Sequence, residues 1–308
     1  VTESQEQQVK NVLDYPLLSF DDAITVSGDG SYLLSSRILG VIPFKDVKVI
    51  PTDSTTVLVS GSTVGIYMET DGVLVIDTGE IISEEGRAEE PAEKIIEPGD
   101  YIVAFNDEII ETKKDLVEDL EKLKQDTVEL QIPLSLSPVK DIKGEYKLGI
   151  WVRDNTQGIG TLTFVDQNGN YGALGHGISD VDTGELLHID DGDLYQAQIV
   201  GIQKGSSGSP GELSGLIHYE AEKIIGSIEK NCEQGIYGRL SELPEELGLR
   251  KMEVAYKQEL EIGPASILCC VDGTVREFDA EITRIDMNHE DTNKSFVIQV
   301  TDPELLEL

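Results

Sequence analysis

The apolar positions of the chain follow mainly the two-residue period of β-strands. The segment "TTVLVSGSTVGIYMETDGVLVIDTG", residues 55–79, contains three short runs rich in Val, Ile and Thr, separated by turn-forming residues. Later runs form two expected hairpins, which turn at Asn168-Gly169 and near Asp272-Gly273. The pattern therefore predicts a mainly β chain, and the many short strands of its second half favour a barrel or a sandwich.

One segment, "ETKKDLVEDLEKLKQ", carries the clearest helical pattern. Its leucines, Leu116, Leu120 and Leu123, recur at the spacing that places them on one face of a helix. Thr112 has the side chain of a good N-cap, and Asp115 stands three residues later. We therefore expect a helix that begins after Thr112.

These patterns divide the chain into four expected parts. Residues 1–54 are a polar lead-in and a small β unit, and residues 55–135 are an α+β module whose order of elements suggests the peptide-binding PDZ type. Residues 136–147 are a linker containing Pro, Lys and Gly, and residues 148–308 consist almost entirely of short strands.

The charge balance narrows the possible partners. The 308 residues include 24 basic and 59 acidic side chains, which gives a formal net charge of −35. Nucleic-acid binding requires a basic surface, so we expect no nucleic-acid partner.

No apolar stretch has the roughly 18 residues that a membrane helix needs. The three cysteines have no CxxC spacing, and His188, His218 and His289 share no metal-ligand spacing, so we expect neither a metal site nor a cofactor.

Two motifs raise the possibility of nucleophilic catalysis. "KGSSGSPGELSGL", residues 204–216, places Ser207 in a G-x-S-G-x-P pattern typical of the surround of a protease nucleophile, and "GALGHGISD" contains His176. A serine hydroxyl needs a base within hydrogen-bond reach, and the base needs an orienting group. Asp180 or Asp182 could orient the histidine, although acids beside glycines more often form turns.

A longer set of motifs resembles a known family. "RILGVIPFKDVKV", "STVGIYM", "EPGDYIVAFND", "GIGTLTF", "YGALGHGISD", "KGSSGSPGEL", "GIYGRL" and "VIQVTDPELL" occur in the order found in the SpoIVB serine peptidases of endospore-forming bacteria. The resemblance runs from about residue 38 to the end. It implies a small N-terminal β segment, a PDZ domain and a chymotrypsin-like double β-barrel, the last of them incomplete at its C-terminus in this chain.

The resemblance also implies site residues. The catalytic base of the family lies in the "ALGH" motif, here His176, and its aspartate lies in the "TDP" motif, here Asp302. Its nucleophile lies in a later Gly-x-Ser-Gly motif, which would follow Leu308. We therefore expect the chain as given to lack the nucleophile and to be inactive.

Two of these residues have competing interpretations. In the family, the glycine-rich turn that contains Ser207 carries no nucleophile. The residues between His176 and Ser207 also leave room for only about three or four strands, too few to complete a first barrel. "TDPE" alone would make Asp302 an N-cap, with Pro at the first helical position. The capping and catalytic roles of Asp302 could coexist.

The resemblance places a ligand site in the PDZ region. "STVGIYM" corresponds to the carboxylate-binding loop and the strand after it, so Val64, Gly65, Ile66 and Tyr67 are the expected peptide-binding residues. A ligand strand would add at Ile66–Met68, and the ligand could act in cis or in trans. An alternative function is a non-catalytic peptide-binding protein in which the β domain serves as a scaffold.

The resemblance finally implies a partner and a location. The substrate would be a protein, a membrane-associated inhibitor of an intramembrane protease that activates a late sigma factor. The place of action would be the space between the two forespore membranes, outside the cytoplasm, with the full-length protein membrane-anchored or secreted.

Overall fold

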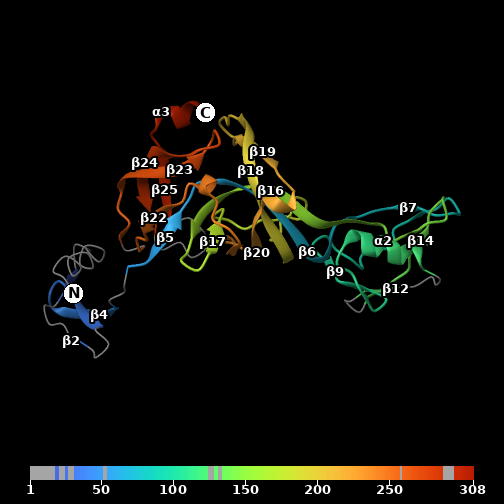
Figure 1. The fold of residues 1–308 in the computed structure, drawn as a ribbon. Coiled ribbons are helices and arrows are strands. Elements are labelled where there is room, and N and C mark those ends of the chain that lie inside the picture. Colours follow the sequence, from blue (N-terminus) through green and yellow to red (C-terminus); the bar gives the residue numbers. More distant parts are fainter. Residues whose placement is uncertain are drawn as a thin grey trace.

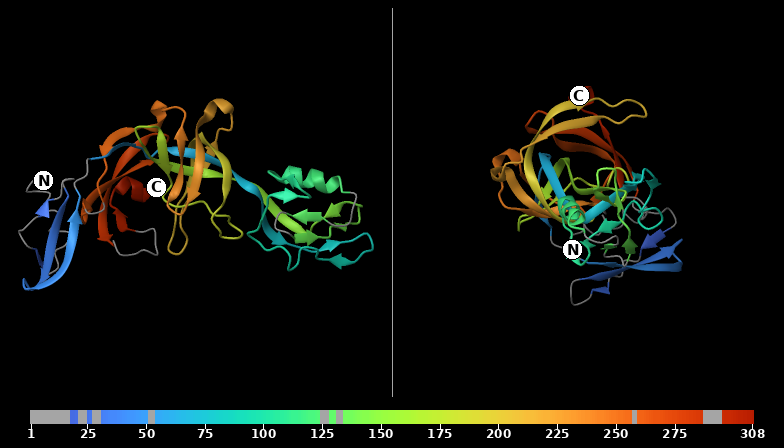
Figure 2. Two further views of the ribbon diagram at one scale, coloured as in Figure 1. Left: turned by 90° about the horizontal axis from the view of Figure 1, so that it is seen from below. Right: turned by 90° about the vertical axis from the view of Figure 1, so that its right-hand side faces the viewer.

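A computed structural model describes residues 18–20, 25–26, 31–50, 54–123, 128–130, 134–256, 259–286 and 295–308. The polar lead-in expected at the start of residues 1–54 lies outside these ranges. A large central β-structure has a small β unit at one end and a mixed α/β module at the other (Figures 1 and 2). No helix within the described ranges is both long and apolar enough to cross a bilayer.

The N-terminal unit is a four-stranded antiparallel sheet. Its strands are β1 (Leu18–Phe20), β2 (Thr25–Val26), β3 (Tyr32–Ile38) and β4 (Ile42–Val49). β3 is central, because β4 pairs with it along its length and β1 and β2 pair with different parts of it.

Six strands of the central structure form a closed circuit of antiparallel pairs. They are β6 (Thr63–Thr78), β16 (Ile150–Val165), β17 (Asn170–Ala173), β18 (Ile189–Gln203), β20 (Ile224–Cys232) and β21 (Gly235–Leu240). Around the circuit the order is β6, β16, β17, β21, β20, β18 and back to β6. Closure matters because it removes the unpaired edges that an open sheet would present.

The interior of this circuit holds the main core. Along β6 the side chains of Val64, Ile66 and Met68 alternate inward and are at most 1% exposed. They pack with buried residues of the other strands, among them Leu162 and Leu194. Gly65 lies on the opposite face, where a Cβ atom would come within 2.5 Å of a side-chain carbon of Ile217.

Further strands extend the circuit. β19 (Glu212–Ile217) pairs with β18, and β5 (Thr56–Val59) joins β16 to β22 (Arg250–Glu253). The expected hairpin at Asn168-Gly169 is confirmed, since β16 and β17 flank that turn. Single 3₁₀ turns, η1 (Ala221–Lys223) and η2 (Glu245–Leu247), complete this region.

The α/β module is inserted between two consecutive strands of the circuit. It spans residues 79–149 and contains β7 (Ile81–Ile82), β8 (Ala88–Glu89), β9 (Tyr101–Ile102), β10 (Ala104–Phe105), β11 (Glu108–Ile109), α2 (Lys113–Glu121), β12 (Val128–Leu130), β13 (Leu134–Leu136), β14 (Val139–Lys140) and β15 (Tyr146–Lys147). α2 begins where the sequence predicts, with a capping box between Thr112 and Asp115. A separate core, including Phe105, Ile110 and Leu116, fills the module.

This arrangement differs from the expected domain boundaries. Residues 55–78 were expected in the PDZ module, but β5 and β6 are hydrogen-bonded into the central sheet. The expected linker, residues 136–147, contains the β14–β15 hairpin, whose Tyr146 and Lys147 lie beside α2. The boundaries differ from the expected ones because β6 pairs with a strand that is distant in the sequence. It pairs with β16 from Thr63 opposite Thr161 to Thr78 opposite Ile150.

The C-terminal segment forms a separate three-stranded antiparallel sheet. β23 (Gly263–Cys270), β24 (Val275–Ile285) and β25 (Phe296–Val300) pair in that order and are followed by the short helix α3 (Pro303–Glu307). The hairpin expected near Asp272-Gly273 is confirmed, because β23 and β24 flank it and Gly273 adopts a φ of +87°.

The buried core predicts a large stability difference between two leucines on neighbouring strands. Leu194→Ala, at a side chain that is 0% exposed, should lower the free energy of unfolding by about 2–5 kcal/mol, because it leaves a cavity in the closed circuit. Leu216→Ala, at a side chain that is 47% exposed, should cost less than about 1 kcal/mol. Urea denaturation of both variants checks this, and equal losses would contradict the described core.

Candidate active site

His176 lies in the loop that follows β17, the third strand of the circuit in chain order. Leu174 and Gly175 have φ values of +67° and +147°, and they turn the chain out of β17 immediately before the histidine. The imidazole is exposed, and its Nδ1 lies 2.9 Å from the carbonyl oxygen of Gly177. Since a carbonyl only accepts, this contact requires the proton on Nδ1. The neutral ring then offers Nε2 as its proton-accepting nitrogen.

A side chain from a distant hairpin holds this loop in place. Asn231, near the end of β20, accepts a hydrogen bond from Ile178 N at 2.9 Å. Its amide nitrogen donates to Ile178 O at 2.8 Å and to Leu187 O at 2.9 Å. Gly177 lets the two segments approach closely, because a Cβ atom there would lie 2.6 Å from Cys232 O. No local motif of the sequence points to Asn231, since its partners are 53 and 44 residues away.

A second anchor involves the two aspartates that follow the histidine. Asp180, only 2% exposed, accepts hydrogen bonds from the backbone N–H groups of Asp182 and Thr183 at 3.0 Å each. Arg153 of β16 forms ion pairs with Asp180 and, at 2.8 Å, with Asp182. Among the described hydrogen bonds, neither carboxylate reaches His176. Both aspartates therefore fix the loop to β16 and do not orient the imidazole.

Asp302 caps the helix α3, as the sequence predicts. Its Oδ1 accepts hydrogen bonds from Glu304 N at 2.9 Å and Leu305 N at 3.3 Å, while Oδ2 lies 3.5 Å from Asp279 N. Arg276 forms an ion pair with Glu304 at 2.8 Å, and this hydrogen bond raises the pKa of Arg276. Within the described part of the chain, no hydrogen bond or ion pair joins Asp302 to His176.

Ser207 lies in an exposed turn between β18 and β19. The backbones of Ser206 and Ser209 hydrogen-bond to each other at 2.8 and 2.9 Å, and Gly208 between them has a φ of +82°. The glycines at the neck of the hairpin have a packing role, because a Cβ on Gly205 would meet Gly211 N at 2.6 Å. The G-x-S-G-x-P pattern thus has a structural explanation, and no described hydrogen bond connects Ser207 with His176.

The expected peptide-binding strand has no free edge. At Val64–Tyr67, β6 pairs with β16 on one side and with β18 on the other. Val64 and Ile66 are also buried inside the circuit. Because a ligand strand needs unpaired backbone groups, addition of a peptide at Ile66–Met68 does not fit the described structure.

Comparison with known proteins identifies the class of protein. Residues 144–308 match a family of serine peptidases, and this segment contains His176, Ser207, Asn231 and Asp302. The family is the SpoIVB peptidase S55 family, and the chain belongs to it. Membership implies a sporulation-related serine peptidase. Searches of the curated proteins and of the solved structures gave no match.

The anchoring of the histidine loop by Asn231 predicts a local effect. Asn231→Ala leaves three backbone groups without their partner, at a cost of roughly 1–3 kcal/mol for each buried group. We expect amide hydrogen exchange across residues 174–180 to accelerate by about ten-fold or more. Asn155→Ala is the matched control, because the side chain of Asn155 bonds only to the neighbouring Asp154 among the described contacts. Unchanged exchange in Asn231→Ala would show that these bonds do not hold the loop.

Proposed function

We propose that this chain carries the histidine and aspartate of a SpoIVB-type serine endopeptidase, with His176 as general base. The observation that carries the proposal is the position of His176 within the matched family segment, on a loop held by Asn231 and by the Arg153 ion pairs. The contact between Nδ1 and Gly177 O leaves Nε2 available to take a proton. A base with this tautomer can deprotonate a serine hydroxyl and later protonate the leaving amine.

As part of this proposal, the two β-structures of the chain correspond to the two barrels of a chymotrypsin-like peptidase. The closed six-strand circuit would be the first barrel, because it carries the histidine, and the β23–β24–β25 sheet would begin the second. The module at residues 79–149 would be the PDZ-type domain, inserted between two strands of the first barrel rather than preceding it.

Asp302 would orient the imidazole while still capping α3. Its Oδ1 serves both cap hydrogen bonds, and its Oδ2 has only the 3.5 Å contact with Asp279 N among the described bonds. Oδ2 could therefore accept a hydrogen bond from Nδ1–H of His176, in place of Gly177 O, once the two elements approach each other. Backbone N–H groups beside the nucleophile would stabilise the oxyanion, each by roughly 3–4 kcal/mol.

The turn around Ser207 favours a nucleophile other than Ser207. The backbones of Ser206 and Ser209 hydrogen-bond to each other across the turn, and Lys204 at its base donates to Leu306 O and Glu307 O at 3.0 and 3.2 Å. We retain the family expectation that the attacking serine belongs to a Gly-x-Ser-Gly motif after Leu308. The biological role that follows is cleavage of a membrane-associated inhibitor in sporulation signalling, outside the cytoplasm.

Peptide hydrolysis tests the proposal directly. Activity on a casein peptide is measured for residues 1–308 and for the chain extended through about 60–100 further residues of its reading frame, a domain-size estimate. In the active form, His176→Gln should reduce kcat by about 10⁴-fold or more. Ser207→Ala should leave kcat unchanged.

The matched control is His188→Gln, since His188 stacks on Tyr101 with ring centroids 5.4 Å apart. This variant should retain activity. Hydrolysis by residues 1–308 that disappears in Ser207→Ala would contradict the assignment and favour a compact site at Ser207. Activity that is insensitive to His176→Gln would contradict the role of the histidine.

A further inference from the structure

The hairpin formed by β3 and β4 ends in an apolar turn. Its loop comprises residues 39–41, because Ile38 pairs with Ile42 across the ladder. The large apolar side chains in and beside the loop are between 58% and 74% exposed: Leu39, Val41, Ile42 and Phe44. Turns that face water are usually built from Gly, Asn, Asp, Pro and Ser, so a set of apolar side chains is unusual here. We call residues 38–44 the hairpin tip.

Leu39 is unfavourable in its place for two independent reasons. Its φ of +53° lies in the left-handed region, which Asn, Asp and Gly adopt more readily than leucine does. Its side chain is also 68% exposed. An asparagine would suit both the turn and the solvent. Contact with an apolar medium outside the chain would offset both costs, because it would remove the leucine side chain from water.

The residues that flank the hairpin tip are basic. Arg37 and Lys45 are its immediate neighbours, and Lys48 follows on β4. Residues 31–50 contain these three basic side chains and one acidic side chain, Asp46, which gives a local charge of +2. The whole chain has a formal charge of −35, so the hairpin differs in sign from the rest of the molecule.

The hairpin projects from one end of the molecule. Its two strands extend away from the central β-structure, with the turn at the outer end (Figure 2). β4 has eight residues and is about 26 Å long at the usual rise of a strand. This length exceeds the Debye length of about 8–10 Å at physiological salt. The hairpin tip can therefore reach an anionic surface while the acidic central structure stays at a distance where its repulsion is largely screened.

We propose that the hairpin tip inserts into the surface of a lipid bilayer that contains anionic lipids, without crossing it. The apolar side chains lie at the boundary between headgroups and acyl chains, roughly 5–10 Å deep. Arg37 and Lys45 lie at the level of the anionic headgroups, which attract their charge. Their long aliphatic stems allow the charged ends to stay in water. The inference goes beyond the proposed peptidase function, because it involves neither His176 nor Asp302.

A bilayer suits the hairpin tip better than a protein partner does. A standard protein interface involves about 20–30 residues on each side, whereas the apolar side chains of the tip surround one narrow turn. Anionic headgroups also complement the basic residues beside it. A second copy of this chain is disfavoured further, because it carries the same formal charge of −35 and would be repelled.

Flotation with lipid vesicles tests the proposal. Residues 1–308 are mixed with vesicles of equal parts phosphatidylcholine and phosphatidylglycerol, and the bound fraction is measured against lipid concentration. We expect saturable binding that weakens at high salt, because salt screens the attraction between the basic residues and the headgroups. Val41→Ser and Leu39→Asn should each weaken binding by about ten-fold. Asn tolerates the left-handed turn, so Leu39→Asn should fold normally.

Two controls separate the hairpin tip from other parts of the chain. Val200→Ser makes the same change on β18 in the central structure, at a side chain that is 63% exposed, against 74% for Val41. It should change vesicle binding by less than about two-fold. His176→Gln should bind vesicles as the unmodified chain does, so loss of the peptidase role would leave this inference intact.

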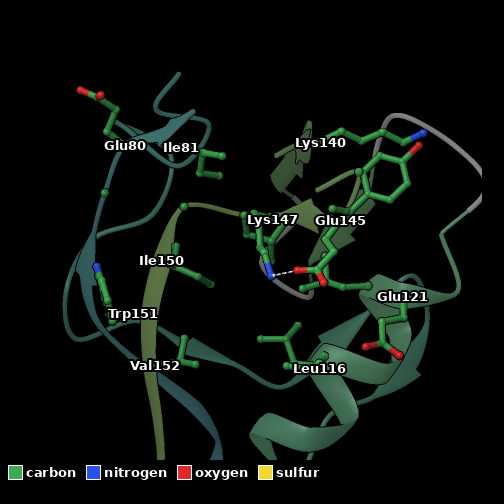
Figure 3. A pocket seen from close by; sticks show the side chains of 17 residues that line it. Glu80, Ile81, Leu116, Glu121, Lys140, Glu145, Lys147, Ile150, Trp151 and Val152 are labelled. Atoms are coloured by element: carbon green, nitrogen blue, oxygen red, sulfur yellow. Dashed lines mark ion pairs between the residues drawn. The ribbon is translucent and has the colours of Figure 1, made fainter. Parts of the chain in front are cut away.

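Tryptophan fluorescence reports how deeply the tip inserts. When Phe44→Trp is combined with Trp151→Phe, the indole at position 44 should emit at shorter wavelength on binding and be quenched by lipids brominated in their acyl chains. Trp151, the only tryptophan of the unmodified chain, is the control. It lies in the inserted module, points away from α2 (Figure 3) and is 66% exposed, so brominated lipids should not quench it.

Three results would overturn the proposal. They are the absence of vesicle binding by the unmodified chain, equal binding by Val41→Ser and Val200→Ser, and an indole at position 44 that brominated lipids do not quench. Sedimentation that shows a dimer in lipid-free solution, lost in Val41→Ser, would assign the hairpin tip to a second copy and would also contradict insertion into a bilayer.

Discussion

The antiparallel ladder between β6 and β16 is the interaction on which the rest of the structure depends. Its inner part, from Thr63 opposite Thr161, closes the six-strand circuit and encloses the main core. Its outer part, to Thr78 opposite Ile150, carries the inserted module, in which α2 and residues 148–152 line a cavity. Because the same ladder forms both parts, the main core and the inserted module share one continuous pair of strands. β6 lies outside the segment that matches the family, and yet it completes the sheet that supports His176.

The candidate base is held by segments that are far apart in the sequence. Asn231 fixes Ile178 and Leu187, Arg153 fixes Asp180, and Gly177 permits the close approach of the two loops. These contacts satisfy buried polar groups that would otherwise lose their water partners. They explain how an exposed histidine can keep a defined orientation. They also give Asp180 and Asp182 a structural role, through their ion pairs with Arg153. The sequence around His176 alone is compatible with either a structural or a catalytic role for these aspartates.

The sequence predicted local features well and remote pairings poorly. The helix after Thr112, the turns at Asn168-Gly169 and Asp272-Gly273 and the cap at Asp302 depend on neighbouring residues, and the structure confirms them. The partners of β6 could not be predicted, because an apolar strand pattern specifies which side chains are buried but not which strands lie at its edges. For the same reason, the sequence did not indicate the long-range contacts of Asn231. It also placed the expected peptide-binding site on β6, a strand whose edges are both paired there. The glycine pattern around Ser207 suggested chemistry, whereas the structure shows a packing requirement at the hairpin neck.

Amide hydrogen exchange along β6 tests the closed circuit most directly. With both edges paired, residues 64–68 should exchange only on global unfolding, at the same slow rate as the neighbouring β16 and β18 segments. β25, at the edge of the three-stranded sheet, provides the comparison and should exchange faster. Exchange of residues 64–68 that is as fast as that of β25, or that slows when a peptide is added, would show that β6 has an open edge and would contradict the account.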